Sequence, residues 1–172
     1  MTQPSKDELA VINEILDLAT EVTLASVRPD GMPHASTTHF AHRGLTLYLA
    51  IAIDSEKSHN VQHCSRVAYT INTSYRSWRE IRGLAVDATA RLVTGVEEFA
   101  TASLLLQKKY PEFATIISDF SQLPWPGMVF LRCDPLHIAL LDYAKGFGNT
   151  VHIDLASGTD HFAKETLAAA IP

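Results

Sequence analysis

The chain has 172 residues, of which 47% are hydrophobic and 19% are charged. These values are typical of a globular protein with one real core, and they exclude a disordered chain. The net charge is −5 and no basic stretch is present, so we expect no nucleic-acid partner. No apolar run approaches the roughly 20 residues of a membrane-spanning helix, and residues 1–7 are polar. We therefore expect a cytoplasmic protein with no membrane partner and a single domain over residues 1–172.

The first predicted element is an amphipathic helix. Ser5 and Glu8 form a capping-box pattern, and apolar residues recur at helical spacing from Leu9 to Ala19. Three strands are predicted after it, separated by turns with Gly31 and Gly44, over residues 22–27, 33–41 and 45–51. Two hairpins in succession predict an antiparallel meander that later strands can close into a barrel.

The second half of the chain alternates short helices and strands. We predict helices over 55–64, from Thr94 to the residues before Pro111, and over 112–120. The predicted strands span residues 66–72, 82–94, 128–133 and 137–142. The fold class is therefore α+β, mainly β, with six or seven antiparallel strands and flanking helices.

A candidate anion site lies at the predicted helix start at Ser55. Helix amides at this point are unpaired and the helix dipole adds positive charge, so a phosphate binds well there. Lys57 puts a cation in the first turn, which is the wrong sign for the dipole unless an anion neutralises it. The alternative is a capped surface helix with a solvated lysine.

Three further segments are candidates for ligand contacts. Ser36, Thr37 and Thr38 make a strand polar on both faces, which suits either a polar ligand or an edge strand facing water. Arg82 and Trp78 belong to a segment whose arginines bind phosphate or stack on rings, or whose tryptophan plugs a barrel end. Lys145 lies in a glycine-rich loop that suits close approach to a ligand or a simple turn.

No metal site is predicted. His34, His39 and His42 lie close together, but no carboxylate near them sets a ligand geometry, so we interpret them as solvated or hydrogen-bonded histidines. Cys64 and Cys133 are interpreted as two reduced thiols.

In this order, residues 24–40, 45–72 and 78–98, with the strands over 128–142 and the loop after them, resemble the pyridoxamine 5′-phosphate oxidase-like, FMN-binding split-barrel family. The resemblance covers about two-thirds of the chain and rests on an ordered set of motifs that are loose individually. It implies a split β-barrel and an FMN cofactor bound at the interface of a homodimer. A dimer also agrees with the small interior of such a barrel, which leaves no room for a flavin.

The resemblance also implies roles for seven residues. The second strand would contact FMN through Ser36, Thr37 and Thr38, and the phosphate would be held by Ser55 and Lys57. Arg82 would contact the flavin and stabilise its anionic reduced form, and Lys145 would come from the second protomer. We name no catalytic acid or base.

The C-terminus departs from the family pattern. The oxidase proper ends in an Arg-x-His-x-Arg-like segment that holds its phosphorylated substrate, whereas residues 148–152 here read Gly-Asn-Thr-Val-His. We therefore expect an FMN-dependent oxidoreductase that passes electrons between a nicotinamide nucleotide or small organic substrate and FMN, and not the oxidase proper. The alternatives are a non-catalytic flavin sensor, or a haem- or deazaflavin-binding member in which His152 is the least implausible axial ligand.

Overall fold

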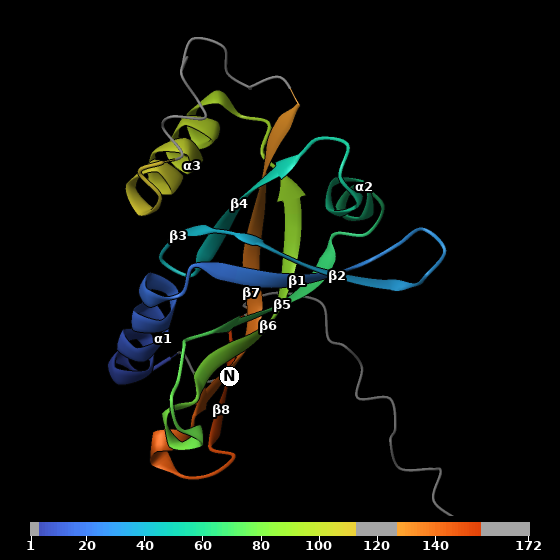
Figure 1. Ribbon diagram of the computed structural model, residues 1–172. Coiled ribbons are helices and arrows are strands. Elements are labelled where there is room, and N and C mark those ends of the chain that lie inside the picture. The colour runs from blue at the N-terminus through green and yellow to red at the C-terminus, as the bar shows by residue number, and fades with distance from the viewer. Residues whose placement is uncertain (1–3, 113–126, 156–172) are drawn as a thin grey trace, which may run out of the picture.

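The computed structural model describes residues 4–112 and 127–155 (Figure 1). The predicted helix over 112–120 thus lies almost wholly outside the described residues. The helices are α1 (Lys6–Leu18), α2 (Glu56–His63) and α3 (Val96–Lys109), with short 3-10 turns η1 (Trp78–Glu80) and η3 (Tyr143–Lys145). The strands are β1 (Glu21–Val27), β2 (Pro33–His39), β3 (Ala41–Arg43), β4 (Thr46–Ala52), β5 (Arg66–Asn72), β6 (Arg82–Leu92), β7 (Met128–Asp142) and β8 (Thr150–Asp154).

All the described strands belong to one antiparallel sheet, in the order β2-β1-β5-β6-β7-β4-β3, with β8 paired to β7. The sheet curls until β2 approaches β4, which makes a half-open barrel (Figure 1). The predicted α+β, mainly β, split-barrel class is therefore confirmed. The described part of the chain has eight strands where six or seven were expected.

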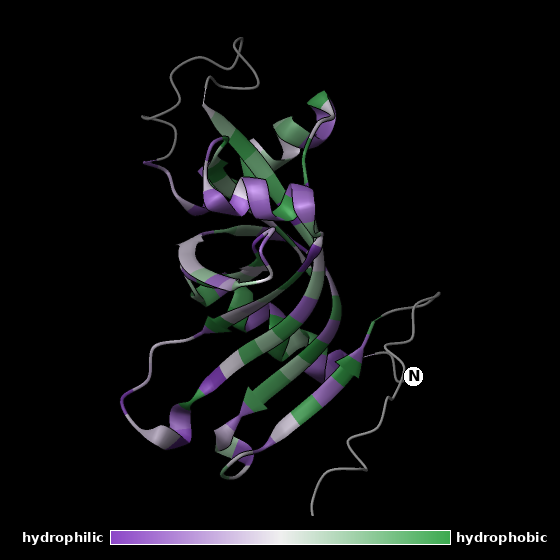
Figure 2. Ribbon diagram, turned by 90° about the vertical axis from the view of Figure 1, so that its right-hand side faces the viewer, coloured by the Kyte–Doolittle hydropathy of each residue, from purple (hydrophilic) through white to green (hydrophobic). Residues whose placement is uncertain are grey.

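Alternating side chains decide which face of the sheet forms the core. In β5, Val67, Tyr69 and Ile71 are buried while the residues between them are exposed. The same banding of hydrophobic and hydrophilic residues runs along several strands in Figure 2. Because the side-chain period of a strand is two residues, this pattern fixes the register and leaves an outer face of mostly small residues.

The predicted meander is wrong. The β1–β2 hairpin forms, with Gly31 at φ 85° in its turn, but β4 pairs with β7 instead of continuing from β2. The reason is burial on both faces of β4. Leu47 and Leu49 enter the main core, while Tyr48 packs with Phe130 in a second cluster under α3. A strand covered on both sides is stable only in the middle of a sheet, and turn patterns do not report this.

The two predicted strands over 128–133 and 137–142 are one continuous strand, β7. Pro135 lies inside it, opposite Ala88, where the β6–β7 register shifts at a bulge. Proline removes one backbone donor, and a bulge is one of the few places in a sheet that tolerates this loss. The edge strand β8, which pairs with the second half of β7, was not predicted.

Helix α1 begins as expected from its sequence. The Ser5 backbone N–H donates to Glu8 Oε2 at 2.7 Å, and the Glu8 N–H donates to Ser5 Oγ at 3.2 Å. Its buried residues Ile12, Ile15 and Leu16 join the main core. None of the described helices is long and apolar enough to cross a membrane.

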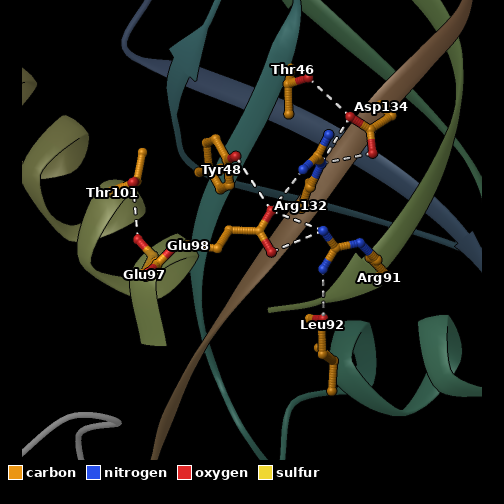
Figure 3. A network of polar contacts seen from close by, with 9 residues as sticks. All are labelled: Thr46, Tyr48, Arg91, Leu92, Glu97, Glu98, Thr101, Arg132 and Asp134. Carbon is orange, nitrogen blue, oxygen red and sulfur yellow. Dashed lines mark hydrogen bonds and ion pairs between the residues drawn. The ribbon is translucent and has the colours of Figure 1, made fainter. Parts of the chain in front are cut away.

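Helix α3 begins at a different cap from the one predicted. Its N-cap is Gly95, with no side-chain hydrogen bond, so Thr94 does not cap it. The helix is attached to the sheet by Glu98, whose carboxylate accepts from Arg132 Nη1 at 2.7 Å and from Arg91 Nη2 at 2.8 Å (Figure 3). Asp134 holds Arg132 Nε from the other side at 2.8 Å. This network joins α3 to β6 and β7.

Candidate functional site

The start of α2 is held in place by local and long-range hydrogen bonds. Ser55 is the N-cap, because its Oγ accepts from the Ser58 N–H at 3.3 Å and donates to the Ala52 carbonyl at 2.7 Å. Further along the helix, the buried Asn60 amide donates to Ser26 Oγ on β1 at 3.0 Å. A buried amide that meets its partner fixes the helix against the β1–β2 hairpin.

Lys57 and Ser36 come together at this helix start. Lys57 Nζ donates to Ser36 Oγ at 3.0 Å, which joins α2 to β2 across 21 positions of sequence. Within the residues that the structure describes, Lys57 forms no ion pair. The pair therefore presents a cation and a hydroxyl beside the unpaired amides of the first helical turn.

Arg28 and His34 complete a basic cluster here that the sequence did not reveal. Arg28 Nη2 donates to the two Glu56 carboxylate oxygens at 2.9 and 3.1 Å and lies 3.2 Å from His34 Nδ1. His34 Nδ1 is also 2.9 Å from Glu56 Oε2. His34 was predicted to be hydrogen-bonded and not a metal ligand, and it is indeed hydrogen-bonded. The only sequence signal for Arg28 was its place in the hairpin turn, which is why it was missed.

The other two hydroxyl residues of β2 lie on different faces. Thr37 is exposed on the outer face, where its Oγ1 is 3.1 Å from Thr23 Oγ1. Thr38 is partly exposed on the same face as Ser36. Every residue of β2 keeps some exposure, as expected for an edge strand. Of the three predicted contacts on this strand, the structure brings only Ser36 to Lys57.

Arg82 and Lys145 belong to a second cluster, around Asp142. Arg82 faces Asp142 in the β6–β7 ladder and its Nη2 donates to Glu14 on α1 at 2.9 Å. Its pKa is raised, first by the Glu14 hydrogen bond, and the pKa of Glu14 is lowered by the same bond. Lys145 Nζ lies 3.7 Å from Asp142 Oδ2. This end of the sheet is at the bottom of Figure 1, whereas α2 is at its upper right.

Exposed aromatic rings adjoin this second cluster. Trp78 meets Phe147 edge-on with ring centres 5.7 Å apart, and Phe147 meets Tyr143 at 5.5 Å. Phe147 is 83% exposed and Trp78 49% exposed. Trp78 therefore does not plug the barrel, and the glycine-rich loop is a turn that displays a phenyl ring.

The described residues hold no group of three or more histidine, cysteine, aspartate or glutamate side chains able to bind a metal ion. His152 Nδ1 lies 3.2 Å from His137 Nε2, and the two rings stack with centres 5.2 Å apart. His39 and His42 contact the carbonyls of Thr20 and Gly44. Cys64 and Cys133 are both free, and burial raises the pKa of the Cys133 thiol to about 12.

Known structures share this fold. A putative pyridoxamine 5′-phosphate oxidase from Listeria innocua is 25% identical, with a TM-score of 0.61 over 78% of this chain and 98% of its own. The haem-binding protein of Mycobacterium smegmatis is 17% identical, with a TM-score of 0.70 over 90% of this chain but 60% of its own, so the chain spans under two-thirds of that protein. The haem-storage protein HutZ of Vibrio cholerae is 20% identical, with a TM-score of 0.60 over 72% of this chain and 87% of its own.

A search of curated proteins found no match. The sequence itself matches the pyridoxamine 5′-phosphate oxidase family over residues 10–140, which is most of the chain and includes the barrel strands from β1 to most of β7. Together with the split-barrel fold, this match identifies the chain as a member of the pyridoxamine 5′-phosphate oxidase family.

Proposed function

We propose that the chain is an FMN-binding flavoprotein that holds the FMN phosphate at the start of α2. The observation that carries this proposal is the 3.0 Å contact between Lys57 Nζ and Ser36 Oγ. It joins two groups of different elements that a phosphate can use together, a cation and a hydroxyl. Ser55 and the free amides of the first helical turn lie beside them.

The polar groups around this point fit a phosphate. Arg28 Nε is buried and has no hydrogen-bond partner among the described residues, although its Nη2 is paired with Glu56. Buried donors are normally satisfied, so an unpaired guanidinium N–H suits an anionic ligand. Lys57, Arg28 and the helix dipole together supply the positive potential that a phosphate monoester needs.

For the reaction, we propose an oxidoreductase. FMN, when bound, supplies hydride and electron transfer at its isoalloxazine ring, while the protein binds and orients it. The electron partner is a nicotinamide nucleotide or a small organic molecule. Arg82 lies between the carboxylates of Glu14 and Asp142, which balance its charge, so a role for Arg82 at the flavin is less supported than the phosphate role of Lys57.

The proposed flavoprotein is a homodimer with the flavin at the interface. Small side chains of four neighbouring strands line a hollow of about 300 Å³ in the outer face of the sheet, and they include Thr23, Ala25, Ala68 and Ala85. Thr37 lies at the margin of this face, next to Thr23. A second copy that covers the face would bring its own Lys145 loop toward the flavin.

Haem binding is the second candidate. It is favoured by the names of two structural relatives, the haem-binding protein of M. smegmatis and the haem-storage protein HutZ. The hydrogen bond between His152 and His137 leaves one of the two rings with a free nitrogen at most on that side. A deazaflavin, or FMN without catalysis, remains within the same family of ligands.

An absorption spectrum of the purified protein separates these candidates. A flavin band near 450 nm that bleaches under NADPH or NADH supports the proposal. A yellow protein that resists reduction indicates a non-catalytic flavin module, and a Soret band indicates haem. Protein that stays colourless after incubation with FMN contradicts both flavin candidates.

Substitution of Lys57 tests the phosphate site directly. Lys57→Ala should weaken FMN binding by about 1.5–3 kcal/mol, the typical worth of a hydrogen bond to a charged group. Quenching of flavin fluorescence gives the affinity. The matched control is Lys108→Ala, because Lys108 is an exposed lysine of α3. Equal affinity of the two variants would show that the phosphate lies elsewhere.

A further inference from the structure

The first residue of α2 is an acid that already neutralises the basic cluster. Glu56 Oε1 accepts from Arg28 Nη2 at 2.9 Å, and Glu56 Oε2 lies 2.9 Å from His34 Nδ1. Arg28 and His34 are thus held by one carboxylate, while the neighbouring Lys57 contacts only the neutral Ser36 hydroxyl. Glu56 takes the place among these groups that a ligand anion would take.

The Glu56 side chain is free to leave this place. It is 53% exposed, and Arg28 is 39% exposed, so water competes with their ion pair. Exposed ion pairs of this kind are worth little to stability. Helix α2 is instead anchored by the buried Asn60–Ser26 hydrogen bond and by Val61 in the core. The carboxylate can therefore rotate into solvent while the helix stays in place.

We propose that Glu56 is an internal counterion that the phosphate of a ligand displaces, and that it sets how strongly the site prefers phosphorylated over unphosphorylated flavin. This proposal rests on the phosphate site described above. With Glu56 in place, the charges of Arg28, Lys57 and Glu56 sum to +1. With the carboxylate gone they sum to +2, which matches the charge of about −2 on a phosphate monoester.

A purely structural role for Glu56 makes the opposite prediction. If the carboxylate served to position Arg28 and His34 for the ligand, its removal would loosen both side chains and weaken binding. If it competes with the ligand, its removal frees both groups and strengthens binding. The sign of the change in affinity therefore decides between the two roles.

The decisive variant is Glu56→Gln, which keeps the shape and removes the charge. We expect it to bind FMN about five- to twentyfold more tightly than the wild type, from the released ion pair and the lost repulsion of the phosphate. Riboflavin has no phosphate to displace the carboxylate, so its affinity should not change. The control Glu97→Gln alters an exposed acid in the first turn of α3 and should change neither affinity. Weaker FMN binding, or an equal change for both flavins, would overturn the proposal.

A second measurement keeps this proposal separate from the proposed function. If the wild type binds no FMN, the flavin proposal fails, but inorganic phosphate still probes the basic cluster. We then follow the His34 ring signals by NMR during a phosphate titration of wild type, Glu56→Gln and Glu56→Ala. Tighter phosphate binding by both variants supports the counterion role. Unchanged or weaker binding contradicts it, and thermal melts of each variant confirm that the compared proteins are folded.

Discussion

Lys109 is a half-buried lysine at the end of α3 that is used for structure. Its Nζ donates to the Leu16 carbonyl of α1 at 2.8 Å and lies 3.7 Å from the centre of the Phe40 ring. Burial lowers the pKa of Lys109 to about 8, although the nearby Asp17 opposes this effect. The folded protein therefore carries the Lys109 charge at a cost.

This cost predicts how stability depends on pH. Between pH 8 and the unfolded lysine pKa of about 10.4, the unfolded chain binds the Lys109 proton and the folded chain does not, so stability rises with pH. Relative to Lys109→Met, the wild type should gain about 1–2 kcal/mol of unfolding free energy from pH 7.5 to 9.5. Urea melts at the two pH values measure this difference, which cancels the other titrating groups. Comparing Lys108→Met with the wild type should give no such gain, and a gain of equal size there would refute the assignment.

The residues of the candidate site differ in how far sequence could predict them. Ser55 and Lys57 were found because a helix cap and its first turn are local patterns. Arg28, His34 and Glu56 meet only because the β1–β2 hairpin brings its turn to α2, and no local pattern reports that contact. The roles given to the predicted residues stay predictions.

At the scale of elements, the attachment of α3 depends on one carboxylate. Burial raises the pKa of Glu98, but hydrogen bonds from Arg132 and Arg91 outweigh this effect and the net pKa is lowered. A lowered carboxylate pKa stabilises the fold above the unfolded value, and this contribution is lost as the pH falls through the folded value. The α3 attachment should thus weaken in acid, below about pH 4.5.

The matched pair Glu98→Gln and Glu97→Gln tests this attachment. Glu98→Gln leaves Arg132 and Arg91 without their shared acceptor and should cost about 1–2 kcal/mol at pH 7. Glu97 is exposed and bonds no arginine, so Glu97→Gln should change stability by less than about 0.5 kcal/mol. Urea denaturation gives both values. The gap should shrink as Glu98 is protonated at low pH, and a constant gap would contradict the ion-pair explanation.

Elements defined by local signals were predicted well, and those defined by pairing were not. The boundaries of β5 and the cap of α1 follow from period-two burial and the Ser5–Glu8 box. The continuity of β7 through Pro135 and the edge strand β8 depend on the neighbouring strands β6 and β7. A proline in a strand pattern argues for a break unless a bulge accommodates it, and the bulge is visible only in the folded sheet.

At the scale of the whole molecule, the outer face of the sheet is unusual for a surface in water. Its centre carries Ala25, Ala68, Ala85 and Ala139, with Thr23 and Thr70 beside them. Long charged side chains normally cover exposed strands, and a hollow field of small, mostly apolar residues is a common mark of an interface. The family membership and the Thr37 hydroxyl at the margin of this field agree with a second copy as the occupant.

The dimer is tested by filling the hollow. Light scattering should give the wild type a mass of twice 18.9 kDa, because each copy covers the outer face of the other. Ala68→Arg places a long charged side chain in the centre of this face and should give a monomer that also loses FMN, since the flavin needs both copies. Ala10→Arg, on the exposed side of α1, is the control and should stay dimeric with flavin bound. A wild type that binds FMN tightly as a monomer would place the flavin within one chain, and an Ala68→Arg dimer would move the interface to another face.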